Sequence, residues 1–164
     1  MQGCGLLVTL RRQFGEGLLA RAMHDEARAR KAFVAARLEQ EQVVQQQKDY
    51  GPPVCVLGLI DAALGNKEAA LQEGRRAMEL LPVEKDSISG QSVRAFFAVI
   101  AAWAGEKDLA QQQLATASST YGAGLITSYV QLKLSPFWDP LRGDPRFEQI
   151  VAPFAPKDAA SPAK

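Results

Sequence analysis

Residues 54–82, VCVLGLIDAALGNKEAALQEGRRAMELLP, are the part of the chain that leaves the fewest structural options open. An almost entirely apolar stretch predicts one helix over about Val54–Leu64, and apolar residues three and four apart predict a second over about Lys67–Leu81. Gly65-Asn66 supplies a turn between them, and Pro82 ends the second helix. A lone helix hairpin cannot bury its own apolar face, so we expect it to stack on similar hairpins in the same chain.

The order of small and large residues in this hairpin resembles the tetratricopeptide repeat (TPR), a helix-turn-helix unit with small residues where its helices cross. The matching landmarks are Leu57, Gly58, Leu64, Gly65, Ala70, Ala77 and Pro82. Asp61 and Gly74 depart from the pattern, because the family usually has an aromatic or other large residue at these two positions. The resemblance therefore implies looser packing inside this hairpin.

Two further copies of the pattern can be aligned with the first. Matching Ala104-Gly105 to Leu64-Gly65 gives a copy about 40 residues later, with its landmarks at Ala98, Ala110, Leu114 and Ala117. An earlier copy has Gly17 in its first helix and Ala29, Phe33 and Ala36 in its second. The resemblance implies an all-α fold, a right-handed TPR-like superhelix of about three hairpins plus closing helices, which is near the minimum for a stable stack.

The remaining elements follow from periodicity and from helix-capping residues. Ser135-Pro136 and Asp144-Pro145 each place a capping residue before a proline that suits the first helical turn, so two short helices close the fold. Asp25 is expected to cap the second helix, and residues 83–90 are expected to be a polar linker. The other predicted helices cover about residues 5–23, 25–47, 91–103, 107–118 and 125–134. We expect one repeat domain over residues 1–154 and a disordered tail over residues 155–164, which lacks apolar side chains of any size.

Composition excludes several classes of function. The formal net charge of +1 provides no overall attraction to nucleic acid, and the basic residues near the amino terminus are expected to be solvated helix faces. Cys4 and Cys55 lie far apart without a CxxC motif, which favours a reducing compartment, and we expect Cys55 to be core. The early apolar run Leu6–Leu10 is too short to span a bilayer. We therefore expect a cytoplasmic protein with no export signal and no membrane insertion.

No arrangement of residues indicates catalysis, a cofactor or a metal. His24 is the only histidine, and phosphate-binding glycine motifs and kinase signatures are missing from the sequence. The carboxylate pairs Asp25-Glu26 and Asp139/Asp144 stand where helices begin and are expected to cap them. The closing aromatic residues are expected to cover the last hairpin, with a partner-anchoring role as the alternative; they are Phe137, Trp138, Phe147 and Phe154. We expect a protein that is not an enzyme.

The resemblance to TPR proteins places a partner-binding groove along the first helix of each hairpin. The groove positions are Arg11, Phe14, Leu18 and Arg21, then Cys55, Leu59 and Ala63, then Ala95, Val99 and Trp103. This groove is apolar with an arginine rim, and it lacks the Lys and Asn set with which some TPR domains clamp a terminal carboxylate. It suits a peptide or protein partner with apolar anchors, acidic near Arg11 and Arg21. Alternatively, these residues pack against the protein's own terminal helices or a second copy in a homodimer.

A narrower resemblance gives an alternative function. The segments KEAALQEGRRAMELLPVEKD and SPFWDPLRGDPRFEQIV are similar to parts of the carboxy-terminal TPR region of large bacterial proteins that carry a kinase, class III nucleotide cyclase or winged-helix regulator domain upstream. The likeness covers about residues 25–152. It implies a sensory or docking module of a signalling protein, whereas the broader TPR resemblance implies a scaffold or adaptor.

Overall fold

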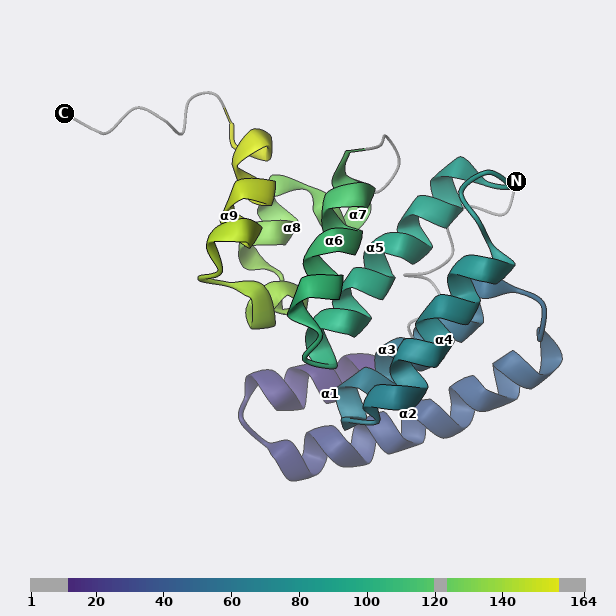
Figure 1. Cartoon of the computed structure of the whole chain (residues 1–164). Helices are drawn as coiled ribbons and strands as arrows, with labels where there is room; N and C mark the ends of the chain where they lie inside the picture. The colour runs from purple at the N-terminus through teal and green to yellow at the C-terminus, as the bar shows by residue number, and fades with distance from the viewer. Residues whose placement is uncertain (1–11, 120–123, 157–164) are drawn as a thin grey trace.

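The protein is all-helical, as predicted, in the computed structural model, which describes residues 12–119 and 124–156 and contains no strand within them (Figure 1). Arg11, the start of the first predicted helix and most of the predicted tail lie outside the described residues. The α-helices are α1 (Arg12–Ala22), α2 (Glu26–Gln46), α3 (Gly51–Leu64), α4 (Lys67–Leu80), α5 (Ser87–Trp103), α6 (Lys107–Ser118), α7 (Gly124–Thr127), α8 (Tyr129–Leu134) and α9 (Pro145–Val151). The 3-10 helices are η1 (Pro136–Leu141) and η2 (Ala152–Phe154).

Consecutive helices pair into hairpins that stack in chain order. The pairs are α1 with α2, α3 with α4 and α5 with α6, and α2 packs on α3 while α5 packs on both α3 and α4. The α1–α2 hairpin lies across one end of the stack, and α8 and α9 lie beyond α6 on the side away from α4 (Figure 1), while α7 contacts both α5 and α6. Because α3 and α5 are covered by neighbours on several sides, most of their residues are buried, and most of the buried residues are apolar.

The three hairpins share one turn geometry. His24, Gly65 and Gly105 adopt left-handed backbone angles, with φ of 60°, 83° and 83°. After each of them, a backbone N–H reaches five residues back to a carbonyl, from Asn66 to Asp61 in the second hairpin (2.9 Å). The equivalent bonds run from Asp25 to Ala20 (2.9 Å) and from Glu106 to Ala101 (2.8 Å). This is the Schellman arrangement that ends a helix while satisfying its last carbonyls, so each hairpin turns in the same way.

Because only glycine enters the left-handed region without a Cβ penalty, the turns differ in strain. We expect His24→Gly to raise the free energy of unfolding by about 1 kcal/mol. The opposite change, Gly105→Ala, should lower it by a similar amount, since nothing lies within 4 Å of the added Cβ and only backbone strain changes. Urea denaturation measures the free energy of unfolding of both variants. A change of the same sign in the two variants would contradict the shared turn geometry.

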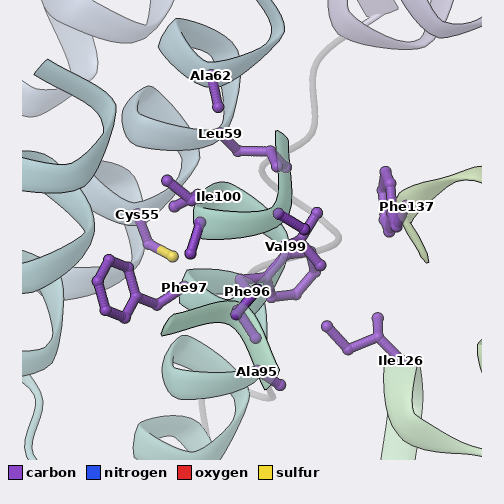
Figure 2. Packing of buried hydrophobic residues seen from close by; sticks show 14 of the residues in the cluster. Cys55, Leu59, Ala62, Ala95, Phe96, Phe97, Val99, Ile100, Ile126 and Phe137 are labelled. Carbon is purple, nitrogen blue, oxygen red and sulfur yellow. The ribbon is translucent and has the colours of Figure 1, made fainter. Parts of the chain in front are cut away.

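The repeat landmarks form the contact surfaces between helices. The landmark residues Ala29, Ala70 and Ala110 expose at most 1% of their surface, and Ala36, Ala77 and Ala117 at most 2%. Cys55 is completely buried among α3 and α5 side chains, which confirms its predicted place in the core (Figure 2). Burial raises the pKa of its thiol to about 12, so it stays an unreactive apolar group at neutral pH.

The packing at Gly74 corrects the expectation of a loose second hairpin. A Cβ built on Gly74 would lie 2.3 Å from Cδ2 of Phe97, whose side chain is 1% exposed. The large side chain that the family pattern places on α4 is therefore supplied by α5 of the next hairpin. Gly17 of α1 similarly receives the ring of Phe33, which would lie 2.5 Å from an added Cβ.

Several predicted boundaries differ from the structure. Helix α5 begins at Ser87, inside the predicted linker, because Asp86 accepts hydrogen bonds from the backbone N–H of Ile88 and Ser89 and caps the helix. The predicted helix over residues 125–134 is divided in two, since Ser128 caps α8. The caps predicted at Asp25, Ser135 and Asp144 are confirmed.

The closing aromatic residues cover the last hairpin as predicted. Trp138 and Phe147 are completely buried, Phe137 is 8% exposed, and only Phe154 is half-buried. Phe137 packs edge-on against Phe96 of α5, with ring centroids 6.2 Å apart. These rings therefore complete the core of the stack and do not form an exposed anchor.

Candidate functional site

One cavity of about 980 Å³ lies where the first hairpin, the end of α3, the end of α5 and the closing segment meet. We call it the groove. Its lining residues are Leu18, Arg21, Ala22, His24, Glu26, Ala29, Arg30, Phe33, Ala62, Ala63, Leu64, Gly65, Trp103, Pro136, Asp139 and Pro140. A volume of this size lies at the upper end of the range for ligand-binding sites, and the mostly apolar lining with a few charged groups is typical of them.

Arg21 lines the groove and is held there by contacts with three helices. Its guanidinium carbon lies 4.8 Å from the ring centroid of Phe33 and 5.2 Å from that of Trp103. Its Nη2 donates a hydrogen bond to the carbonyl oxygen of Ala63 over 2.5 Å. The cation is thus fixed by two aromatic faces and one carbonyl from three different helices. Burial lowers the pKa of Arg21, and the charge of Glu26 partly opposes that effect.

Trp103 joins the groove to the closing segment. Its indole Nε1 donates a hydrogen bond to the carbonyl oxygen of Phe137 over 3.0 Å. The ring centroids of Trp103 and Phe137 are 5.6 Å apart. This contact brings Pro136, Asp139 and Pro140 of η1 into the wall of the groove. The protein's own closing segment therefore covers one end of the groove, as in the alternative of self-packing, while the cavity beside Arg21 stays open.

The charges around the groove leave Arg21 without a carboxylate partner. Asp139 is paired with Arg142, whose Nε lies 2.7 Å from Oδ1. Arg30 and Glu26 lie on α2 at the rim and are exposed. Among the described residues, no carboxylate oxygen lies within 4.0 Å of the Arg21 guanidinium. The groove therefore contains a partly desolvated cation that forms no ion pair within the described residues, although the charge of Glu26 acts on it from the rim.

The structure divides the predicted groove residues into two groups. Leu18, Arg21 and Trp103 line the groove, together with Ala63. Phe14, Leu59 and Val99 lie in the core instead, with exposed fractions of 0–1%, as do Cys55 and Ala95. Figure 2 shows Val99 and Phe96 of α5 facing Phe137 and Ile126, so later parts of the chain cover the face that sequence reasoning assigned to a partner. Arg11 lies outside the described residues.

Sequence reasoning did not predict the contribution of η1 and of Phe33. Phe33 was expected only as a landmark within its hairpin, yet its ring also faces Arg21. Pro136, Asp139 and Pro140 reach the groove because Phe137 packs on Trp103. No local spacing rule joins residues 33, 103 and 136–140, so only the packing of the closing segment could reveal this wall.

A second unusual polar group lies between α2, α3 and α4. Asp61 is completely buried, and its Oδ1 accepts hydrogen bonds from Nε of Arg37 (2.7 Å) and Nδ2 of Asn66 (2.6 Å). Oδ2 of Asp61 and Oε2 of Glu73 are both buried without a hydrogen-bond partner within the described structure. Burial, and then the neighbouring charge of Asp61, raises the pKa of Glu73 to about 8.

This carboxyl pair has a structural explanation. Because its raised pKa keeps Glu73 protonated at neutral pH, its hydroxyl is a donor suited to the unpartnered oxygen of Asp61. Asp61 has no exposed surface for a substrate to reach. Across residues 12–119 and 124–156, no cluster of three or more His, Cys, Asp or Glu side chains is placed to hold a metal ion.

Comparisons of the chain with protein families, curated proteins and solved structures found no match. None of the helices in the described ranges combines the length and apolar character needed to cross a bilayer.

Proposed function

We propose that this protein is a non-catalytic interaction module, a TPR-like right-handed superhelix of three hairpins that binds a peptide or protein partner in the groove. The single observation that carries the proposal is the groove itself, a cavity of about 980 Å³ with apolar walls and one aromatic-clamped arginine. A few fixed polar groups in an apolar concavity are what specific recognition needs.

The repeated architecture supports the TPR-like part of the proposal. The left-handed turn residues recur at intervals of about 40 residues, and a buried alanine follows each turn at the same place in the second helix. Stacked helix hairpins create extended concave surfaces, which such proteins use to bind other chains. Apolar residues of α1, α3 and α5 at one end of these hairpins contribute to the same groove.

Selection of short random peptides against the full chain tests this function. A peptide that binds the folded protein is then titrated against two variants by fluorescence anisotropy. Leu18 lines the groove, so Leu18→Gln should weaken binding about tenfold because it removes apolar contact with the peptide. Leu38 on α2 is 59% exposed and lies outside the groove, so Leu38→Gln is the matched control and should leave the affinity unchanged.

Two results would contradict the proposal. In the first, selection enriches no peptide that prefers the folded chain to the urea-denatured chain. In the second, the enriched peptides bind the Leu18→Gln variant as tightly as the wild-type protein, which would place their site elsewhere.

A further inference from the structure

Arg21 has hydrogen-bonding capacity that the protein itself does not use. A guanidinium carries five N–H donors in a planar fork, and of these only Nη2 makes a hydrogen bond to a described residue, the carbonyl of Ala63. The rings of Phe33 and Trp103 lie against the guanidinium, with their centroids 4.8 Å and 5.2 Å from its central carbon, so its movement in the groove is restricted. Less rotamer entropy is therefore lost when an acceptor binds.

The charges of the groove select an anion with a single negative group. Cationic ligands would meet Arg21 and Arg30, while Asp139 is already neutralised by Arg142. A ligand with several phosphates would approach the carboxylate of Glu26 on the rim. One carboxylate at Arg21 satisfies the free donors without this repulsion, in a partly dry setting where charge-assisted hydrogen bonds are strong.

We propose that the groove recognises an aspartate or glutamate side chain within a partner peptide, next to an apolar side chain that packs on Trp103 and the two prolines of η1. This inference rests on the proposed function and names the chemistry of its partner. Arg21 contacts residues of α2, α3 and α5, so a ligand bound to it lies where these three helices line the groove. A chain end bound there would leave much of the lining uncovered, which is why an internal side chain fits better than a terminal carboxylate.

The test uses peptides from the same selection, synthesised with both ends blocked, in matched pairs that differ only by Glu→Gln or Asp→Asn. We expect an acidic residue beside an apolar one in the enriched peptides. The acidic member of each pair should bind the wild-type chain roughly 10- to 100-fold more tightly than its amide counterpart. This comparison leaves the protein unchanged, so it does not depend on whether a variant folds.

Protein variants then assign the effect to Arg21. In Arg21→Gln, the preference for the acidic peptide should fall to within about twofold, and Arg21→Lys should retain an intermediate preference, since it keeps the charge and loses the planar fork. Arg28→Gln is the matched control because Arg28 is exposed on α2 and outside the groove, and the full preference should remain. Circular dichroism checks that each variant is folded.

The outcomes separate this inference from the proposed function. Enriched peptides that lose affinity in Leu18→Gln but contain no acidic residue would overturn the carboxylate inference while leaving the groove in place. A preference for acidic peptides that survives unchanged in Arg21→Gln would overturn it as well. If the peptides bind only with a free carboxyl terminus, the group recognised at Arg21 is a terminal carboxylate and the inference of a side-chain carboxylate is wrong. If no peptide binds, the proposed function itself is wrong.

Discussion

Replacing Gly74 with leucine should destabilise the protein by about 2–3 kcal/mol, although the repeat pattern has a large residue at this position. The added Cβ would lie 2.3 Å from Cδ2 and 2.7 Å from Cε2 of Phe97. That ring is buried in the core and cannot turn into solvent. The gain in helix propensity from removing a glycine, about 1 kcal/mol, is smaller than the cost of overpacking. Chemical denaturation of the variant measures the difference.

Two further variants make this result specific. Gly15→Ala on α1 is the control, because nothing lies within 4 Å of its added Cβ, and it should stabilise the protein by about 0.5–1 kcal/mol. The double variant Gly74→Leu with Phe97→Ala moves the large side chain from α5 to α4 and should recover part of the loss. If Gly74→Leu alone proved as stable as the wild-type protein, the packing of α5 against α4 described above would be incorrect.

Replacing Glu73 with glutamine should remove a large part of the stability that the protein loses as the pH rises from 4.5 to about 8. Burial and the charge of Asp61 raise the pKa of Glu73 from its ordinary value of 4.5 to about 8. Between these two values the folded protein holds a proton that the unfolded chain has released. The stabilisation is therefore complete below pH 4.5 and is lost as the pH rises through 8.

The expected size of this effect is on the order of 1–2 kcal/mol between pH 5 and pH 9, because water screens the half-buried carboxyl group. Glu73→Gln keeps a donor for the Oδ2 atom of Asp61 at every pH, so its free energy of unfolding should vary less over this range. Arg37 and Glu41 of α2 also face the pair and are unchanged in the variant. Urea denaturation at a series of pH values gives the free energy of unfolding of the wild-type protein and of Glu73→Gln as a function of pH.

Glu79→Gln is the control for this experiment, because Glu79 is exposed on the same helix. Its curve should follow that of the wild-type protein. A wild-type stability that does not fall between pH 5 and pH 9 relative to Glu73→Gln would mean that Glu73 is ionised in the folded state and that the two buried oxygens are satisfied in another way.

Most of the helical hairpin structure could be predicted from the sequence, because local interactions determine it. The caps at Asp25, Ser135 and Asp144 act within three residues, and the glycines at the second and third turns meet a backbone requirement that no other residue meets as well. The buried alanines follow from helical periodicity. The Asp86 cap was missed because the segment around it reads as a polar linker.

The sequence by itself determined the all-helical class, the hairpin turns and the buried small-residue faces, since each depends on residues close together in the chain. The tertiary structure alone decided which groove positions stay open. Val99 and Leu59 are buried, whereas Trp103 lines the groove beside the closing segment. It also decided that Phe97 fills the space at Gly74 and that Glu73 and Asp61 each bury an unpartnered carboxylate oxygen. These contacts join residues on different helices, and their energies depend on distances that no spacing pattern within one helix can specify.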